Sequence, residues 1–322
     1  MQLETIQALV QKDLEATDQF IIFRLESTIP LIQNMVQYIL TCGGKRIRPL
    51  LLLLSARACN SQVQHHVDLA AVIELIHTAT LLHDDVVDNA TLRRGHKTAH
   101  TIWGNEASVL VGDFLYSRAF QVVVDLKIAR ILEIFSFATH YIAEGEILQL
   151  MNCKNPDTTE EFYFDIIQRK TAKLFEIAAQ FGGVITASPE EYTETMRQYG
   201  FYLGIAYQLI DDALDYSQPA QETGKNVGND LADGKTTLPL IHALRHCKPQ
   251  EAQLLREAIK TGSCNQLDQI LAIIESTDAI QYTATAAKHY TQKAQAILAN
   301  IPASPYRDAL HQLAGFVVDR TY

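Results

Sequence analysis

The chain has 322 residues, of which 48% are hydrophobic, so it can bury a sizeable core and does not belong to the disordered class. Acidic residues outnumber basic ones by 37 to 27, and the formal net charge is −10. This sign is wrong for a protein that binds the phosphates of nucleic acid, so we expect a globular protein with no nucleic-acid partner.

The cysteines and the apolar runs indicate the compartment. The five cysteines form no CxxC pair, and their odd number predicts free thiols in a reducing compartment rather than a disulfide framework or a zinc site. The first residues lack the basic segment of a signal peptide, and the densest apolar run, residues 49–54, is far too short to span a bilayer. These features predict a soluble, cytoplasmic protein.

Most of the chain follows the amphipathic helix pattern, with apolar residues three and four positions apart. The pattern is clearest over residues 66–88, 193–216 and 278–300. The one run that could form a strand, 120–124, lies inside a longer helical pattern, so we expect helix there. Breaks between helices are predicted at residues 42–44, 94–95, 104, 182–183, 218–234 and 301–305. No low-complexity linker divides the chain, which predicts a single all-α domain over residues 1–322.

The break at residues 218–234 is longer than most connections in a compact domain. It contains Lys225, Asn229 and Asp230, and Lys235 follows directly after it. Because loops of this length usually carry function, we expect these polar residues to belong to a site.

The acidic pattern DDxxD occurs twice, each time at the C-terminal end of a long apolar helix. Residues four apart share a helical face, so Asp84 projects beside Asp88 and Asp211 beside Asp215. Such carboxylate pairs repel each other and oppose the helix dipole, so they do not stabilise the helix. One copy alone could equally be a solvated helix end. Two copies in apolar surroundings instead predict a small Mg²⁺ cluster around a diphosphate, since Mg²⁺ is commonly held by one or two carboxylates together with phosphate oxygens.

Cationic residues stand near these motifs, and a diphosphate needs its charge neutralised on several sides. Residues 43–48 combine two glycines with three cations, although such a basic helix entry is a weak signal by itself. His77 lies seven residues before Asp84 on the same helical face, where a single histidine is more often a core residue. The other candidates are Arg93, Arg94, Lys170, Lys225 and Lys235.

Taken in order, these motifs resemble the trans-type polyprenyl diphosphate synthases over nearly the whole chain. The resemblance is carried by residues 43–49, His77, both DDxxD copies, residues 93–95, Lys170–Thr171, Gln208 and residues 224–235. The residues around the first motif and residues 144–150 most resemble the bacterial members that make an octaprenyl chain for ubiquinone side chains.

The resemblance implies an all-α fold, the isoprenoid-synthase-type bundle of helices around a deep central cavity, usually as a homodimer. It also implies the reaction: an allylic diphosphate, with farnesyl diphosphate the expected primer, condenses with successive isopentenyl diphosphates. About three Mg²⁺ ions per active site would assist the ionisation of the allylic diphosphate. Condensation and loss of a proton would then complete each cycle. Release of the long product implies a transient association with a membrane.

Site residues follow from the resemblance position by position. The metal ligands would be Asp84, Asp88 and Asp211. The allylic diphosphate would be bound by Arg93, Lys170, Lys225 and Lys235, with Thr171 and Gln208 beside the allylic carbon. Isopentenyl diphosphate would be bound by Lys45, Arg48, His77 and Arg94. The catalytic set would be Lys170, Thr171, Gln208, Asp84 and Asp211.

Product length should depend on the residues that precede the first motif on its own helix. Ala79 and Thr80 lie about 6 to 7.5 Å below Asp84, a depth that a short isoprenoid tail already passes. Short-chain members of the resembling family tend to have aromatic rings there, whereas both residues here are small. The alternative is that Ala79 is simply a packing residue. We expect the floor of the tunnel near Phe120, Val123 or Phe135. A product of about eight isoprene units follows.

Four alternatives remain open. A shorter-chain synthase would make farnesyl or geranylgeranyl diphosphate. A metal-dependent HD phosphohydrolase would use His83 and Asp84, but it needs further histidines and leaves the second DDxxD unexplained. A terpene cyclase typically has an Asn/Ser/Glu pattern in place of that second motif. A non-catalytic subunit of a heteromeric synthase usually lacks the aspartates that this chain keeps.

Overall fold

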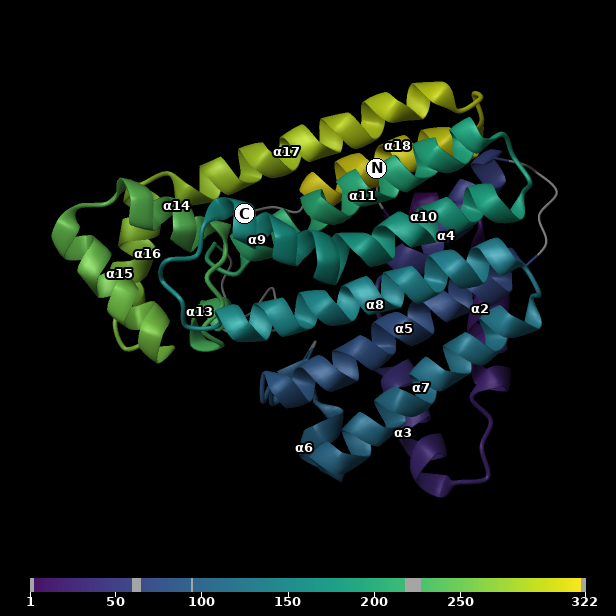
Figure 1. The fold of residues 1–322 in the computed structure, drawn as a ribbon, viewed down its shortest axis with the longest axis horizontal. Coiled ribbons are helices and arrows are strands. Elements are labelled where there is room, and N and C mark those ends of the chain that lie inside the picture. Colours follow the sequence, from purple (N-terminus) through teal and green to yellow (C-terminus); the bar gives the residue numbers. More distant parts are fainter. Residues whose placement is uncertain (1–2, 60–64, 94, 218–226, 320–322) are drawn as a thin grey trace. The chain divides into compact units, whose positions relative to one another are not determined.

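A computed structural model describes residues 3–59, 65–93, 95–217 and 227–319 of the chain (Figure 1). In the first half of the chain the helices are α1 (Leu3–Ala8), α2 (Gln11–Arg24), α3 (Pro30–Thr41), α4 (Ile47–Cys59), α5 (His66–Val87), α6 (Ala99–Trp103), α7 (Asn105–Asp125) and α8 (Ala129–Asn152). In the second half they are α9 (Glu160–Ile167), the π-helical turn η1 (Gln168–Ala172), α10 (Lys173–Ile185), α11 (Glu190–Leu214), α13 (Asn229–Ala232), α14 (Leu238–His246), α15 (Pro249–Thr261), α16 (Leu267–Ser276), α17 (Ala279–Ile297), the 3₁₀ turn η2 (Leu298–Asn300) and α18 (Pro305–Val318). The prediction of an all-α protein is confirmed.

The three helices predicted most clearly are all present, as α5, α11 and α17 with η2. Residues 120–124 lie inside α7, as the longer helical pattern predicts. Gly43 and Gly104 stand at predicted breaks with φ of +63° and +90°, which glycine adopts without a steric penalty. By length and composition α7 is also apolar enough to cross a membrane, a test that core helices of soluble proteins pass as well.

Within the described ranges, the only sheet is a hairpin of β1 (Leu92–Arg93) and β2 (His96–Lys97), which the strand pattern does not predict. Leu92 pairs with Lys97, and Arg93 pairs with His96, in antiparallel register. Strands of two residues are too short to show an alternation of apolar and polar side chains. The sequence therefore reveals only the turn, where Gly95 has a φ of +78°.

The break predicted at Gly182–Gly183 is wrong, because α10 continues through both glycines. A Cβ atom on Gly182 would lie 2.5 Å from the backbone nitrogen of Ala56, and one on Gly183 would lie 2.7 Å from the Cα atom of Thr193. These glycines let neighbouring segments approach α10 closely instead of ending the helix.

We expect Gly182→Ala to lower the free energy of unfolding by about 1–3 kcal/mol, because the added methyl group meets backbone that cannot yield. Gly315→Ala is the matched control. Its Cβ would find its nearest neighbour, the Nε2 atom of Gln295, at 3.7 Å, so it should gain up to about 1 kcal/mol of helix propensity. Urea unfolding followed by circular dichroism measures both; equal effects would contradict the packing role of Gly182.

A capping residue determines where the helix that leads into η1 begins. The hydroxyl of Thr159 accepts the backbone N–H of Phe162 at 3.2 Å, which caps the N-terminus of α9. The wider turn of η1 then follows at residues 168–172, and α10 continues from it. π-Helical turns of this kind are often found at functional sites.

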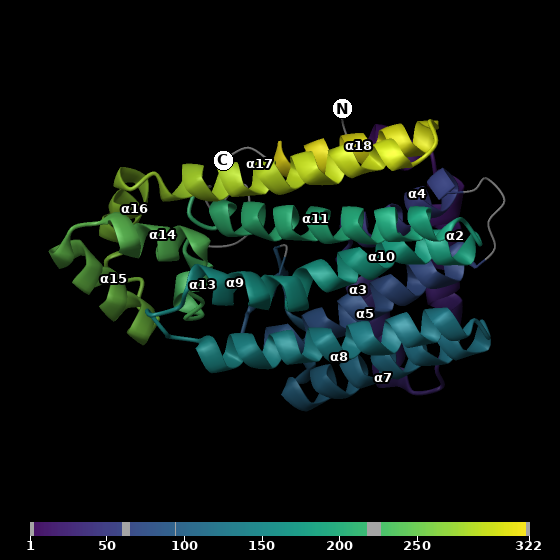
Figure 2. The ribbon, with the colours of Figure 1, turned by 45° about the horizontal axis from the view of Figure 1, so that its top comes forward.

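The chain packs as two compact units. The first unit comprises Met1–Ser136, Leu174–Gly200 and Ile297–Leu313, and the second comprises Phe137–Lys173, Phe201–Ala296 and Ala314–Tyr322. In the first unit α5 packs against α2, α4 and α7. In the second unit α14, α15 and α16 pack against one another, as Figures 1 and 2 both show. The single domain over residues 1–322 stays a prediction.

Each unit has its own buried core. In the first unit the leucines at positions 50–54 of α4 are all completely buried, as expected for a helix that is apolar on every side. In the second unit one cluster gathers around Tyr163, Leu209 and Ile241, and another around Leu240 and Leu255. These cores hold the C-terminal ends of α5 and α11, where the two acidic motifs lie.

Candidate active site

The first acidic motif ends α5, and helix geometry separates its aspartates into two groups. Asp84 and Asp88 lie one turn apart and are half-buried. Asp85 lies about 100° around the helix and is 4% exposed. Arg93 donates to the Oδ1 atom of Asp85 through Nε at 2.8 Å and through Nη2 at 2.7 Å. Asp85 therefore anchors the β-hairpin, and the outer two aspartates are the candidates for metal ligands.

The environment of Asp85 fits this structural role. Burial raises the pKa of the Asp85 carboxyl above its ordinary value, and the guanidinium of Arg93 opposes that shift. The same contact neutralises part of the positive charge of Arg93. The family resemblance assigns Arg93 to binding of the allylic diphosphate. Arg94, assigned to isopentenyl diphosphate, lies outside the described residues.

The cations at the start of α4 and just before it take different partners. Arg46 binds Glu74, and its Nη2 atom lies 3.3 Å from the Oδ1 atom of Asp18, so it is held by carboxylates of the first unit. The Nη1 atom of Arg48 lies 3.1 Å from the Nε2 atom of His77, and its guanidinium stacks 4.5 Å from the ring centre of Phe175. Lys45 is exposed. The structure therefore brings together Arg48 and His77, two residues predicted for isopentenyl diphosphate.

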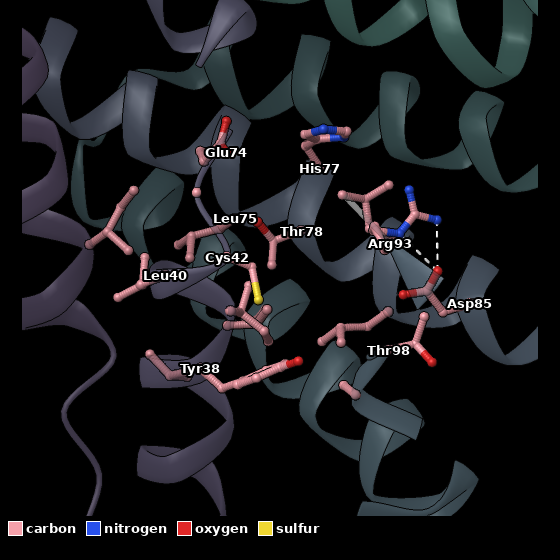
Figure 3. A pocket seen from close by; sticks show the side chains of 18 of the residues that line it. Tyr38, Leu40, Cys42, Glu74, Leu75, His77, Thr78, Asp85, Arg93 and Thr98 are labelled. Carbon is pink, nitrogen blue, oxygen red and sulfur yellow. Dashed lines mark hydrogen bonds and ion pairs between the residues drawn. The ribbon is translucent and has the colours of Figure 1, made fainter. Parts of the chain in front are cut away.

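A pocket in the first unit adjoins α5 (Figure 3). Its lining includes Tyr38, Leu40 and Cys42 near the end of α3, Leu75, Thr78, Leu81 and Leu82 of α5, and the polar groups of Arg46, Glu74, His77, Asp85, Arg93 and Thr98. In Figure 3 Arg93 and Asp85 lie together on one side, joined by the two contacts described above. The lining includes neither Asp84 nor Asp88, although it includes His77 and Leu81, which lie two turns earlier on the same helical face.

The residues predicted to set product length also differ in exposure. Ala79 is completely buried, whereas Thr80 is half-buried and donates its hydroxyl to the carbonyl oxygen of His77 at 2.9 Å. Phe120 and Phe135, both predicted for the tunnel floor, meet edge to face with ring centres 4.7 Å apart. Of the two residues below Asp84, Thr80 is therefore the one with accessible surface.

The second acidic motif ends α11 and repeats the division of roles. Asp211 and Asp215 are half-buried, whereas Asp212 is 2% exposed. The Oδ1 atom of Asp212 accepts from the Nε2 atom of Gln208 at 2.7 Å, and its Oδ2 atom accepts from the hydroxyl of Tyr163. Burial and the nearby carboxylate of Asp230 raise the pKa of Asp212 well above its ordinary value. The middle aspartate is again an internal anchor.

Asp215 holds the segment that follows the second motif. Its Oδ2 atom accepts from the backbone N–H of Asp230 at 3.0 Å, and its carbonyl oxygen accepts from the N–H of Gly228 at 2.9 Å. Lys235 is tied to the same segment, since its N–H donates to the carbonyl oxygen of Asp230 at 2.7 Å and its Nζ atom lies 2.9 Å from Asp233. Lys225 lies outside the described residues.

Lys170 and Thr171 lie in the π-helical turn η1. The ammonium group of Lys170 pairs with Glu146 of α8, and the hydroxyl of Thr171 donates to the Oε1 atom of Gln208 at 2.7 Å. Gly145 allows α8 to approach, because a Cβ there would lie 2.7 Å from the backbone nitrogen of Lys170. Thr171, Gln208 and the second motif thus meet within the second unit.

The oxygen donors of the two motifs suit a hard divalent cation. Within the described ranges no three His, Cys, Asp or Glu side chains are gathered into a ready-made metal cluster. Pairs of carboxylates one turn apart nevertheless fit Mg²⁺, which keeps several water ligands and binds through one or two carboxylates and substrate phosphates. Zinc and iron sites more often include histidine or cysteine ligands.

Two contacts of the candidate site residues could not be read from the sequence. Tyr163 lies 49 positions before Asp212, and Glu146 lies 24 positions before Lys170. No periodic pattern links residues so far apart, so only the fold identifies these pairs. The only local signal for the first pair is a tyrosine seven residues before Lys170, in the helix that leads into η1.

Comparisons with known proteins identify the family of the chain. The model of the polyprenyl synthetase family matches residues 29–276. The chain is 46% identical over 323 residues to an octaprenyl diphosphate synthase of Haemophilus influenzae, covering 100% of this chain and 98% of that protein. It is 45% identical over 318 residues to a geranyl-diphosphate-specific all-trans-nonaprenyl-diphosphate synthase of Rhodobacter capsulatus, covering 98% of each.

Solved structures confirm the fold as well. A polyprenyl synthase from Caulobacter crescentus CB15, complexed with calcium and isoprenyl diphosphate, matches with a TM-score of 0.95 at 41% identity, covering 99% of this chain and 98% of that one. The agreement extends over both sequence and fold. The chain belongs to the polyprenyl synthetase family, the prenyltransferase family that its motifs predict.

Proposed function

We propose that the chain is a long-chain trans-polyprenyl diphosphate synthase that extends an allylic diphosphate, with farnesyl diphosphate as primer, to octaprenyl diphosphate for quinone side chains. The observation that carries this function is the repeated division of roles in the two DDxxD motifs. In each, the middle aspartate is buried and bonded within its own unit, and the outer two are half-buried. The relatives that make octaprenyl and nonaprenyl chains support a product of this size.

The aspartates prepare the ionisation step. Asp84, Asp88 and Asp211 would hold Mg²⁺, about three ions per active site, which when bound supply Lewis-acid stabilisation of the diphosphate leaving group. Arg93, Lys170 and Lys235 would add positive charge around the same leaving group. Glu146 holds the ammonium of Lys170 in place for this contact.

The condensation itself needs no covalent nucleophile from the protein. Breaking the allylic C–O bond leaves a carbocation, which the dipoles of Thr171 and Gln208 stabilise without forming a bond to it. The double bond of isopentenyl diphosphate then attacks this carbon, and a new C–C bond forms. Loss of one proton to the released diphosphate regenerates an allylic diphosphate that is one isoprene unit longer.

Isopentenyl diphosphate would bind at Lys45, Arg48 and His77. Replacing Arg48 with Gln should raise the KM for isopentenyl diphosphate by about tenfold or more, because uniform binding of that substrate alone is lost. The KM for the allylic primer should change by less than about twofold. Steady-state kinetics with each substrate varied in turn measure both constants.

Arg46→Gln is the control for the Arg48 variant. Arg46 comes from the same basic segment, but it pairs with Glu74 and Asp18, so its loss should lower the melting temperature and leave the KM for isopentenyl diphosphate unchanged. Equal effects of Arg48→Gln on the KM of both substrates would contradict the assignment.

We also propose that the enzyme is a homodimer of the cytoplasm that contacts a membrane transiently to release its product. On α7, Leu110 is 66% and Val124 is 55% exposed, and on α8, Phe137 is 69% and Met151 is 78% exposed. We propose that a second copy of the chain, or the membrane at product release, covers these side chains. Light scattering of the purified protein tests the dimer.

Release of inorganic diphosphate tests the reaction class. With farnesyl diphosphate, isopentenyl diphosphate and Mg²⁺, one diphosphate should be released for each isopentenyl unit consumed, and EDTA should stop the reaction. An HD phosphohydrolase would release inorganic phosphate from a single substrate without consuming isopentenyl diphosphate, and that result would reject the synthase.

A further inference from the structure

A chain of hydrogen bonds runs through the second unit from a buried tyrosine to η1. Tyr163 donates its hydroxyl to one oxygen of Asp212, and Gln208 donates its amide N–H to the other oxygen at 2.7 Å. The Oε1 atom of Gln208 then accepts the hydroxyl of Thr171 at 2.7 Å. Four side chains from α9, η1 and α11 thus form one relay, which we define as Tyr163–Asp212–Gln208–Thr171.

The direction of each hydrogen bond in this relay sets the next one. Because the nitrogen of the Gln208 amide is used on Asp212, the carbonyl oxygen of that amide is the end that faces Thr171. A carbonyl oxygen can only accept, so the hydroxyl of Thr171 must donate. The hydrogen of Thr171 therefore points toward Gln208, and its oxygen lone pairs remain available on the other side.

The far end of the relay is held by packing. Tyr163 is 3% exposed and belongs to the buried cluster that includes Ile167, Leu209 and Ile241. Its ring also meets Phe164 edge to face at 5.5 Å. Thr171, at the other end, is 8% exposed and lies in η1. Packing thus holds the phenol ring in place, and its hydroxyl orients the carboxyl group of Asp212.

We propose that Tyr163 is a positioning residue for the ionisation step, acting through Asp212 and Gln208 to hold the Thr171 hydroxyl with its lone pairs toward the developing allylic cation. The inference rests on the proposed position of Thr171 and Gln208 beside the allylic carbon. A dipole that is oriented before the reaction need not reorganise as the charge develops, so it stabilises the transition state more than the ground state. Tyr163 itself is 3% exposed and would act only through these side chains.

Tyr163→Phe removes only the hydroxyl and keeps the packed ring. We expect kcat for the first condensation to fall by about tenfold, the usual scale for removal of a group that orients another, with both KM values unchanged. Tyr199→Phe is the control, because Tyr199 is completely buried and its hydroxyl makes one hydrogen bond, to the carbonyl oxygen of Leu310 at 2.6 Å. It should lower the melting temperature to a similar extent and leave kcat within about twofold of wild type.

A double-mutant cycle with Thr171→Val shows whether Tyr163 acts through Thr171. If it does, Tyr163→Phe should change kcat by less than about twofold when Thr171 is already Val, because the group that it positions is gone. Additive losses, or a Tyr163→Phe enzyme with wild-type kcat, would overturn the inference while leaving the synthase intact. A Thr171→Val enzyme with wild-type kcat would overturn the position of Thr171 in the proposed function, and the inference with it.

Discussion

Replacing Asp84 or Asp211 with Ala is expected to lower kcat by about a thousandfold or more, with little change in melting temperature. Both carboxylates are half-buried, and each stands one helical turn from another carboxylate that repels it. Removing a repelling charge does not harm a helix, whereas the diphosphate loses metal-assisted stabilisation of its developing charge. Single-turnover kinetics and thermal unfolding of each variant measure the two effects separately.

Asp85→Ala provides the opposite pattern within the same motif. Asp85 is buried and accepts two contacts from Arg93, so its loss should lower the free energy of unfolding by about 1–3 kcal/mol. The free energy of unfolding should fall clearly more for Asp85→Ala than for Asp84→Ala. Activity of Asp84→Ala or Asp211→Ala within a few-fold of wild type would show that these aspartates are not metal ligands.

An aromatic ring below the first motif is expected to shorten the product to roughly three or four isoprene units. Ala79→Tyr and Thr80→Phe both place a ring one turn or slightly more below Asp84, where the growing tail would pass. Thr80→Phe should do so with the smaller loss of stability, because Thr80 is half-buried and Ala79 is completely buried. Chromatography of the dephosphorylated products measures chain length.

Thr78→Phe is the control for product length. Thr78 lies on the same helix but lines the pocket that adjoins the face with Asp85, so a ring there should leave the product at full length. A full-length product from both Ala79→Tyr and Thr80→Phe would show that the tail runs elsewhere.

Local periodicity predicted much of the fold and part of the site. Helices α5, α11 and α17 follow from the spacing of apolar residues, because that spacing reports burial of one helical face. The same rule placed Asp84 beside Asp88, since residues four apart are neighbours on a helix. These inferences concern residues within one or two turns of each other, where backbone geometry decides.

Contacts between distant segments could not be predicted in this way. Nothing in the basic segment at residues 43–48 predicts that Arg46 binds carboxylates while Arg48 contacts His77. This difference depends on which neighbours the fold brings close. In the sequence Gly182 indicates a helix end. Only the structure shows that the residue allows the backbone of Ala56 to approach. The bond from Tyr163 to Asp212 joins residues 49 positions apart and is likewise a property of the fold.

The most direct test of the whole account is the length of the product. The purified protein is incubated with Mg²⁺, farnesyl diphosphate and labelled isopentenyl diphosphate, and the labelled product is sized against polyprenol standards. The proposed function predicts a main product of about eight isoprene units, because small residues stand below Asp84 where a ring would stop the chain. A main product that stops at geranylgeranyl length, or the absence of any incorporated label, would contradict it.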